Sequence, residues 1–326
     1  MSERLGVVLF NLGGPDSPAA VRPFLFNLFA DPAIIGLPFG LRHLVAWLIT
    51  RSRARAAAEI YRRLGGSSPL LAGTEAQAEA LAAVLAKRGV TAKVVIAMRY
   101  WHPRAEKAAS ELAAWKPDRI VLLPLYPQFS TTTTESSFKE WRKVAKKAGL
   151  DIATEEIDSY PRLPGWVEGQ ADLLRRELMG LGEAAPVRVL FSAHGLPEKI
   201  VKGGDPYPRQ VEAGARAIAS TLGIAGVDWV VCYQSKVGPL VWIGPSTEAE
   251  IERAGREGKG VVVLPIAFVS EHSETLVELD HDYAETARRA GLAFYRRVAA
   301  IGTHPAFIAG LADLACQSED GEELEA

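Results

Sequence analysis

Continuous apolar runs alternate along the chain with stretches of helical periodicity. The runs are rich in β-branched residues and lack regular polar positions, a pattern typical of strands buried on both faces of a sheet. They cover residues 5–12, 93–100, 119–126, 187–193, 228–234 and 260–268, with weaker candidates at 152–157 and 294–301. Helical patterns between them cover residues 75–88, 105–114 and 210–222. Strands that alternate with helices predict parallel βαβ units.

The two halves of the sequence resemble each other in order. FNLGGPDS at 10–17 corresponds to FSAHGLPE at 191–198, and LLPLYPQFSTTTTES corresponds to VLPIAFVSEHSET. This similarity predicts an α/β fold of two doubly wound, Rossmann-like lobes. Each lobe is expected to hold a mainly parallel four-stranded sheet flanked by helices, with a cleft between the lobes.

The boundary between the lobes is predicted near residues 160–165, where Pro and Gly are typical of a domain junction. We expect an N-terminal lobe over 1–160 and a C-terminal lobe over 161–303. A terminal helix over 304–318 should pack back on a lobe. The final residues, 319–326, are acidic and are expected to be disordered.

One apolar segment carries positive charge at its end. GLPFGLRHLVAWLIT, at 36–50, is interrupted by Arg42 and His43 and is followed by RSRAR. It is shorter than the roughly 20 apolar residues that span a bilayer. Taken alone, the pattern favours a core helix with a solvated basic end. The alternative is an interfacial segment, in which apolar side chains lie beside positive charge.

Composition narrows the class of ligand. The chain has 326 residues, 48% of them hydrophobic, and a net charge of -2 without a basic tract. Nucleic-acid binding needs clustered Lys and Arg, so a small-molecule substrate is expected. Cys232 and Cys316 are too few for a disulfide framework or a four-cysteine cluster. The N-terminal residues MSERLGVVLF lack the features of a signal peptide, which predicts a cytoplasmic protein.

Candidate chemistry lies where predicted strands end. The apolar run at 260–268 passes into SEHSET, which has no Gly, Asn, Asp or Pro to give the backbone geometry of a connecting turn. His194 ends another strand, and ligands of open α/β sheets bind at the carboxyl ends of strands. Imidazole and carboxylate together form a proton relay or a site for a divalent transition metal. The alternative is structural: Glu271, Glu274 and Glu278 have the spacing of a solvated helix face.

The order of six long segments resembles that of the ferrochelatase family over about the whole chain. The segments are FNLGGPDSPAAVRPFLFNLFADP, YRRLGGSSPL, LYPQFSTTTTESSF, FSAHGLPEKIVKGGDPYP, YQSKVGPLVWIGPST and PIAFVSEHSETLVELD. The resemblance implies a lyase of heme and porphyrin biosynthesis that inserts Fe²⁺ into protoporphyrin IX to form protoheme. It also implies ring distortion and removal of pyrrole protons by His and Glu. QSKVGP resembles the branch that acts on protoporphyrin rather than coproporphyrin.

The resemblance implies site residues as well. His194 of FSAHGLP and Glu274 of SEHSET match the catalytic and metal-binding residues of the family. His272, Glu278 and Asp282 match an acidic path for the metal or for protons. The positions that match porphyrin-binding residues are Leu12, Arg53, Tyr61, Ser68, Arg99, Tyr100 and Trp242.

Cofactors and partners follow from the same resemblance. No cofactor is required, and ferrous iron and protoporphyrin IX are the substrates. Some relatives hold an iron–sulfur cluster through four cysteines, but Thr131 occupies the first position and the tail offers only Cys316, so no cluster is expected. Because a porphyrin is poorly soluble and could pass from lipid, residues 36–55, with their basic flank, are expected to form an apolar lip at the cleft mouth that touches the inner face of the membrane. No nucleic-acid partner is expected.

Three alternatives stay open at the level of sequence. The chain could insert another divalent metal, could act on coproporphyrin, or could be a two-lobed tetrapyrrole-binding protein without catalysis. Whether His194 is a base, a metal ligand or both is likewise open.

Overall fold

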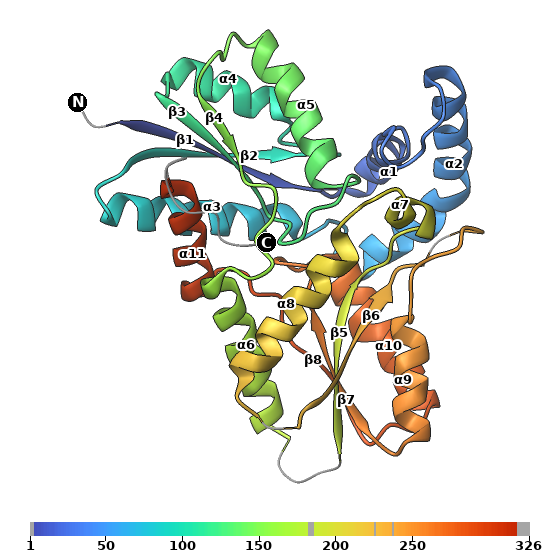
Figure 1. The fold of residues 1–326 in the computed structure, drawn as a ribbon. Coiled ribbons are helices and arrows are strands. Elements are labelled where there is room, and N and C mark those ends of the chain that lie inside the picture. Colours follow the sequence, from blue (N-terminus) through green and yellow to red (C-terminus); the bar gives the residue numbers. More distant parts are fainter. Residues whose placement is uncertain (1–2, 182–185, 225, 237, 318–326) are drawn as a thin grey trace.

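Two four-stranded sheets form two α/β lobes (Figure 1). The computed structural model describes residues 3–181, 186–224, 226–236 and 238–317. The first sheet has the order β2-β1-β3-β4 and comprises β1 (Arg4–Asn11), β2 (Thr91–Met98), β3 (Arg119–Pro124) and β4 (Thr154–Glu156). The second has the order β6-β5-β7-β8 and comprises β5 (Val187–His194), β6 (Asp228–Gln234), β7 (Gly260–Pro265) and β8 (Tyr295–Arg297). All strand pairs are parallel, which confirms the prediction of two similar lobes.

Helices cover both faces of each sheet. Those of the first lobe are η1 (Pro18–Ala20), α1 (Val21–Phe29), α2 (Phe39–Arg63), α3 (Leu70–Lys87), α4 (Ala105–Trp115) and α5 (Thr134–Lys147). Those that follow are α6 (Pro164–Met179), α7 (Glu198–Lys202), α8 (Tyr207–Leu222), α9 (Thr247–Arg256), the π-helix η2 (Glu274–Asp282), α10 (Tyr283–Arg289) and α11 (Pro305–Cys316). In β1, Val7 lies in the same apolar cluster as residues of α3, whereas Val8 clusters with residues of α4 and α5. This alternation explains why the strand is apolar at every position.

Several strands end before their predicted limits, three of them by two or three residues in the main apolar runs. β2 ends at Met98, β3 at Pro124 and β7 at Pro265. β3 and β7 end at a proline, which has no N–H to donate to a neighbouring strand. The residue after each proline still donates to the central strand, from Leu125 N–H to the Phe10 carbonyl at 2.8 Å and from Ile266 N–H to the Ser192 carbonyl at 3.0 Å. Apolar residues such as Ile266 continue beyond that point, which is why the sequence pattern extended these strands too far.

The lobes share buried apolar contacts instead of meeting through an open linker. Tyr160 and Leu163, at the predicted boundary, are buried, and the Tyr160 hydroxyl donates to the Pro124 carbonyl at 2.8 Å. α11 packs on α6 and on α3. It therefore contacts both lobes, whereas the sequence predicted that it packs on one. The predicted acidic tail, 319–326, lies outside the described residues.

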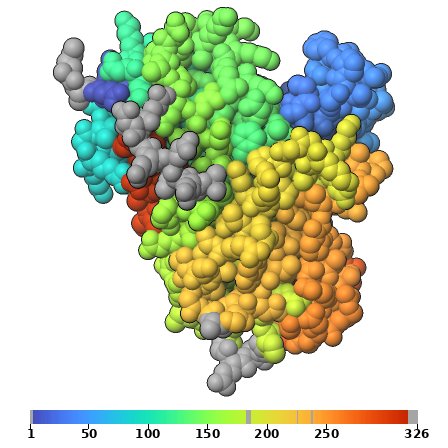
Figure 2. All heavy atoms as spheres, in the orientation of Figure 1, coloured from blue at the N-terminus to red at the C-terminus, as the bar shows by residue number. Residues whose placement is uncertain are grey.

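α2 is not a core helix. Phe39 is 74% exposed, and Leu41, Leu44, Trp47 and Leu48 are also exposed. Figure 2 shows this blue segment projecting from the body of the molecule. The interpretation as a core helix was therefore wrong, because a pattern of apolar positions does not show whether a neighbour covers them. Within the described residues, no helix is long and apolar enough to cross a membrane.

Candidate active site

The carboxyl ends of three strands meet at one edge of the second sheet. His194 is the last residue of β5, and Gln234 is the last residue of β6 and its register partner. After β7, a short loop leads into η2, which begins with Glu274. Parallel strands bring their carboxyl ends to one edge, so segments far apart in sequence converge here.

His194 and Glu274 face each other across this edge. The His194 Nε2 atom lies 3.8 Å from the Glu274 Oε1 atom, and the two side chains are 37% and 31% exposed. His194 Nδ1 lies 2.6 Å from the carbonyl oxygen of Gly195. Because a carbonyl only accepts hydrogen bonds, Nδ1 carries the hydrogen of the neutral ring and Nε2 keeps a free lone pair. That lone pair can take a proton or bind a metal ion.

Trp242 lies beside His194, with the two ring centres 6.4 Å apart. Gly195 permits this close approach. A Cβ atom at Gly195 would lie 3.0 Å from the Gln234 carbonyl oxygen and 3.1 Å from the Trp242 ring. The Gly of the HG pair is therefore needed for packing at the site.

Ser235 connects the two glutamates and was not singled out from the sequence. Its Oγ lies 3.1 Å from Glu274 Oε2 and 2.6 Å from Glu278 Oε2, and its backbone N–H donates to Glu278 Oε1 at 2.9 Å. Ser235 has a φ of 62°, an uncommon backbone conformation for a residue with a Cβ. The signal in the sequence that could have pointed to Ser235 is its position immediately after a predicted strand.

Glu278 is held more firmly than Glu274. It accepts hydrogen bonds from Ser235, from Gln234 Nε2 and from the Tyr283 hydroxyl. Burial raises the pKa of Glu278, and the nearby charge of Glu274 raises it further. The π-helix thus carries one accessible carboxylate at its start and one enclosed carboxylate a turn later.

The remaining residues of the predicted acidic path lie in contrasting places. His272 is only 9% exposed, its ring centre is 4.4 Å from that of Phe268, and burial lowers its pKa. Its Nδ1 atom has no protein hydrogen-bond partner. Asp282 has a 61% exposed side chain and lies 4.0 Å from Arg63 of α2. His272 is therefore buried, whereas Asp282 lies at the surface.

The end of α2 reaches the site through Tyr61. This side chain is buried, and burial raises its pKa to about 12, against the opposing effect of nearby Ser273. Ser68 packs close to Gly14, where an added Cβ would lie 2.5 Å from its side chain. Leu12 is half-buried, and Arg53 is exposed on α2.

Arg99 and Tyr100 form part of a buried ionic network. Both donate to Asp31 Oδ2, at 2.7 Å from Arg99 Nη2 and 2.9 Å from the Tyr100 hydroxyl. Arg99 also pairs with Glu140, and the Tyr100 side chain is fully buried. The Tyr100 side chain has no exposed surface, and a porphyrin-binding role for this position stays a prediction. The pair anchors the chain that leads from α1 to α2.

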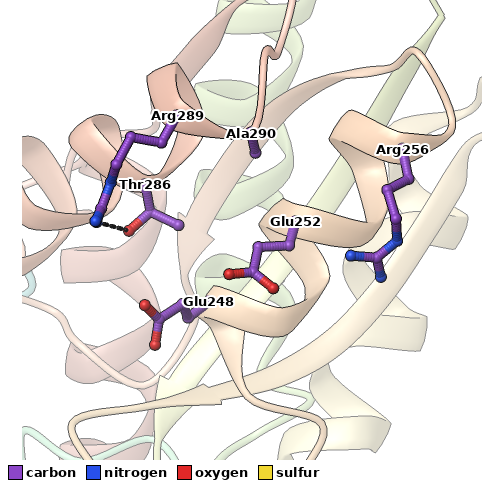
Figure 3. A pocket seen from close by; sticks show the side chains of 6 residues that line it. All are labelled: Glu248, Glu252, Arg256, Thr286, Arg289 and Ala290. Carbon is purple, nitrogen blue, oxygen red and sulfur yellow. Dashed lines mark hydrogen bonds between the residues drawn. The ribbon is translucent and has the colours of Figure 1, made fainter.

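Other pockets lie away from these groups. Figure 3 shows a pocket between α9 and α10, lined by Glu248, Glu252, Arg256, Thr286, Arg289 and Ala290. A second is lined by Asp16, Leu71, Glu75, His102, Pro103, Arg104, Glu106 and Lys107. Neither contains a predicted site residue.

Among the described residues, no group of three or more His, Cys, Asp or Glu side chains could hold a metal ion, so His194 and Glu274 form a two-residue set.

Comparison with known proteins decides the family. A family model for ferrochelatase matches residues 4–319. The chain belongs to the ferrochelatase family. It is a lyase that inserts a metal ion into a porphyrin and acts in porphyrin and heme biosynthesis.

Individual ferrochelatases match over nearly their full length. The chain is 57% identical to the ferrochelatase of Caulobacter vibrioides over 314 residues, which cover 96% of this chain and 89% of that protein. It is 54% identical to that of Phenylobacterium zucineum over 319 residues, which cover 97% and 92% of the two chains.

Solved structures share the fold at low sequence identity. The sirohydrochlorin chelatase SirB of Bacillus subtilis in complex with cobalt matches with a TM-score of 0.53 and 11% identity, over 96% of this chain and 93% of that one. A multi-domain Deinococcus radiodurans protein with structural similarity to chelatases matches with a TM-score of 0.55 and 13% identity, over 98% of this chain and 56% of that one. The chain therefore shares its two-lobed architecture with chelatases of known structure.

Proposed function

We propose that the metal ion is Fe²⁺ and that the porphyrin is protoporphyrin IX, so that the product is protoheme. The observation that supports this site is the separation of 3.8 Å between His194 Nε2 and Glu274 Oε1, with both side chains accessible. Metal insertion releases two pyrrole protons as the ion enters the ring. A base and an anionic group at the same edge suit that exchange.

His194 and Glu274 have complementary roles in this proposal. The Nε2 lone pair of His194 accepts one pyrrole proton, and the Glu274 carboxylate receives the second. Before that transfer, both groups can hold the incoming ion, since imidazole and carboxylate accept first-row divalent metals. Glu278 and Asp282 follow Glu274 along η2 and are proposed to form a path for the metal ion or for protons. His272 is proposed to belong to this path as a buried residue.

Binding of the ring is proposed to involve apolar walls. Trp242 beside His194 and Leu12 of the first lobe are suited to pack on a porphyrin, with Tyr61, Ser68 and Arg53 nearer its rim. Arg99 acts through the α1–α2 connection. Contacts of this kind can hold a ligand in a strained shape that costs about 1–5 kcal/mol, which brings a distorted ring closer to metal entry.

No cofactor is proposed. Cys232 is buried, and burial raises the pKa of its thiol to about 12, so it does not readily provide a thiolate ligand. The exposed apolar side of α2, with its basic residues, is proposed to touch the inner face of the membrane, from which a poorly soluble porphyrin can pass.

An anaerobic assay tests the choice of substrates. The purified chain is incubated with protoporphyrin IX or coproporphyrin and with Fe²⁺, Co²⁺, Ni²⁺ or Zn²⁺, and insertion is followed by absorbance. The proposal expects the highest kcat/KM with Fe²⁺ and protoporphyrin IX. Faster insertion into coproporphyrin, or of another ion, would refute the proposed specificity, and binding without insertion would refute the His/Glu mechanism.

A further inference from the structure

One arginine holds both ends of the segment that carries the acidic site residues. Arg297 of β8 donates from Nη1 to Glu271 Oε1 at 2.9 Å. Its Nε and Nη2 atoms donate to the two carboxylate oxygens of Asp280, at 2.7 and 2.9 Å. Glu271 precedes Glu274 in the chain, and Asp280 follows Glu278. The guanidinium therefore ties together the two ends of the segment that presents both glutamates.

The contact is buried and geometrically restrictive. The Arg297 side chain is 9% exposed, and Glu271 Oε1 also accepts from the backbone N–H of Ala300 at 2.9 Å. A planar guanidinium that binds a carboxylate through two parallel hydrogen bonds fixes orientation as well as distance. Lysine carries the same charge but cannot reproduce that two-point contact.

The conformation of this segment explains why it needs such an anchor. Glu274–Asp282 is a π-helix, a rare conformation that occurs mostly in single turns and often at functional sites. A second contact comes from the same strand, because the Tyr295 hydroxyl donates to the Leu279 carbonyl oxygen at 2.8 Å. Both anchors belong to β8, which β7 separates from β5, the strand that ends with His194.

We propose that Arg297 is a positioning residue for metal insertion. Its two-ended contact with Glu271 and Asp280 sets the place of Glu274 relative to His194, without touching the porphyrin or the metal ion. This inference rests on the proposed function of Glu274. It requires that kcat depend on Arg297 more strongly than porphyrin binding does.

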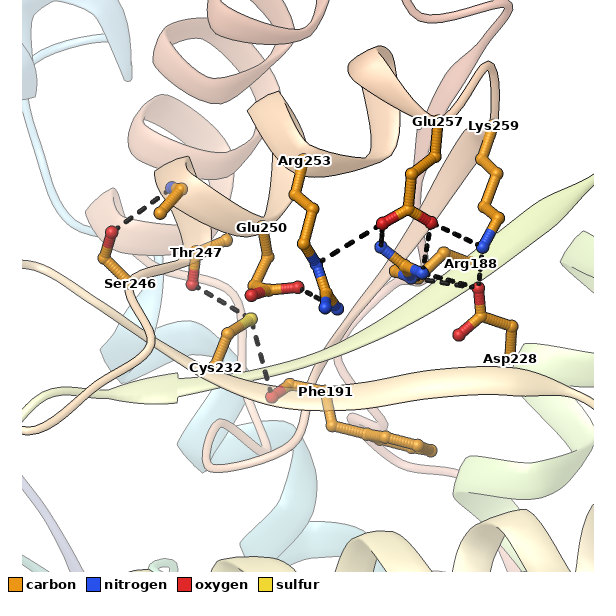
Figure 4. Close-up of polar contacts among 11 residues, drawn as sticks. Arg188, Phe191, Asp228, Cys232, Ser246, Thr247, Glu250, Arg253, Glu257 and Lys259 are labelled. Carbon is orange, nitrogen blue, oxygen red and sulfur yellow. Dashed lines mark hydrogen bonds and ion pairs between the residues drawn. The ribbon is translucent and has the colours of Figure 1, made fainter.

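Arg188 provides a matched control in the same sheet. Its side chain is 6% exposed and also contacts two acidic residues, Asp228 and Glu257 (Figure 4). It lies near the amino end of β5, whereas His194 ends that strand. Arg188→Lys should therefore disturb a comparable ionic cluster without moving the site.

The experiment compares Arg297→Lys with Arg188→Lys at a temperature at which circular dichroism shows both to be folded. Metal insertion gives kcat and KM, and fluorescence quenching gives the Kd of protoporphyrin IX. Loss of an outer contact that orients site residues typically lowers activity about 10- to 100-fold, which is the decrease in kcat expected for Arg297→Lys. Porphyrin Kd should stay unchanged in both variants, and Arg188→Lys should keep the parental kcat.

Equal kcat values for the two variants would overturn the positioning role, as would a loss of porphyrin affinity that accounts for the whole effect. Should Arg297→Lys not fold, Tyr295→Phe provides a milder test. Its control is Tyr160→Phe, which removes another buried hydroxyl that donates to a backbone carbonyl. Only Tyr295→Phe should lower kcat. A parental chain that inserts no metal at all would refute the proposed function instead.

Discussion

The two glutamates of η2 differ in the number of hydrogen bonds that their carboxylate oxygens accept from the protein. Glu278 accepts from the Ser235 backbone and hydroxyl, from Gln234 and from Tyr283. Glu274 has a 31% exposed side chain, and its Oε2 atom lies 3.1 Å from Ser235 Oγ, whose single hydrogen is donated to Glu278. Glu274 therefore keeps oxygen atoms available for a substrate, whereas those of Glu278 mainly order the loop after β6.

Replacing Glu274 by Gln should nearly abolish metal insertion. The amide keeps the shape of the side chain but cannot accept a proton, and general acid–base groups typically contribute about 10²- to 10⁴-fold to a rate. We expect kcat to fall within that range while porphyrin fluorescence quenching still reports binding. Near-parental turnover with both substrates would show that Glu274 is structural.

Glu278→Gln is the matched variant for that experiment. The new amide group would point hydrogens toward the Ser235 and Tyr283 donors, and an unsatisfied buried polar group costs about 1–3 kcal/mol. Urea denaturation should show a lower free energy of unfolding, and kcat should fall less than in Glu274→Gln. A larger loss of kcat in Glu278→Gln than in Glu274→Gln would show that Glu278, and not Glu274, acts in metal insertion.

At the scale of elements, α2 presents an apolar surface that its packing against α1 leaves open. The exposed side chains include Leu44 and Trp47, and basic residues follow in the same helix. A helix that exposes both kinds of group suits the boundary between water and an anionic membrane.

Leu44→Ser combined with Trp47→Ser should weaken binding to anionic vesicles. Flotation with vesicles of phosphatidylglycerol and phosphatidylcholine at low salt should recover the parental chain, and less of the variant. Added salt should reduce recovery, because the basic residues contribute through screened charge. Met179→Ser, at an exposed apolar position of α6, is the control. Equal recovery of parent and double variant would exclude α2 as the contact surface.

A second element-scale feature joins β5 and β6 to the end of α9. Arg188, Asp228, Glu257 and Lys259 form one ionic cluster (Figure 4). The hydrogen bond from Arg188, followed by that from Lys259, lowers the pKa of Glu257 from 4.5 to about 2. A carboxyl whose pKa is lowered on folding adds stability above its unfolded pKa, and that stability is lost as the pH falls toward the folded value.

Glu257→Gln should therefore lower Tm at neutral pH, and the difference from the parent should shrink between pH 4.5 and pH 2. Calorimetric Tm values across this range provide the measurement. Glu168→Gln, at an exposed position of α6, should change Tm little at any pH. A Tm difference for Glu257→Gln that stays constant with pH would mean that its effect comes from packing and not from charge.

At the scale of the whole molecule, hydrogen bonds between the lobes brace the loop before η2. Gln77 of α3 donates to the carbonyl oxygens of Val269 and Gly302, at 2.9 and 3.0 Å, and accepts from Ser270 Oγ at 2.9 Å. A separate contact between the lobes forms where Asp205 of the second lobe accepts from Ser130 and from the Thr131 backbone and hydroxyl. The site loop therefore depends on contacts from the opposite lobe.

Gln77→Leu should destabilise the whole chain, because it leaves two buried carbonyls and one hydroxyl without their partner. Each such group costs about 1–3 kcal/mol, so three of them should cost about 3 kcal/mol or more in urea denaturation. Gln170→Leu is the control, since Gln170 is buried and its side-chain atoms have no protein partner. That change should be neutral or stabilising. A similar loss in both variants would show that volume, not hydrogen bonding, determines the effect.

The sequence by itself determined the strands, their helical connections and the residues at their carboxyl ends. Continuous apolar runs are a direct record of burial on both faces, and parallel strands must bring their ends together. For that reason His194 and Glu274 could be expected at one edge, as the structure has them. The resemblance in six segments added the family.

Tertiary structure alone decided which side chains have neighbours. Tyr100 is buried against Asp31, and α2 exposes an apolar side, because residues distant in sequence cover the first and leave the second open. Ser235 bridges Glu274 and Glu278 only in its positive-φ conformation, and Arg297 meets Glu271 and Asp280 only when β8 joins the sheet. A local pattern records whether a position is apolar or polar, whereas coverage and hydrogen bonding depend on groups that the folded chain brings from elsewhere.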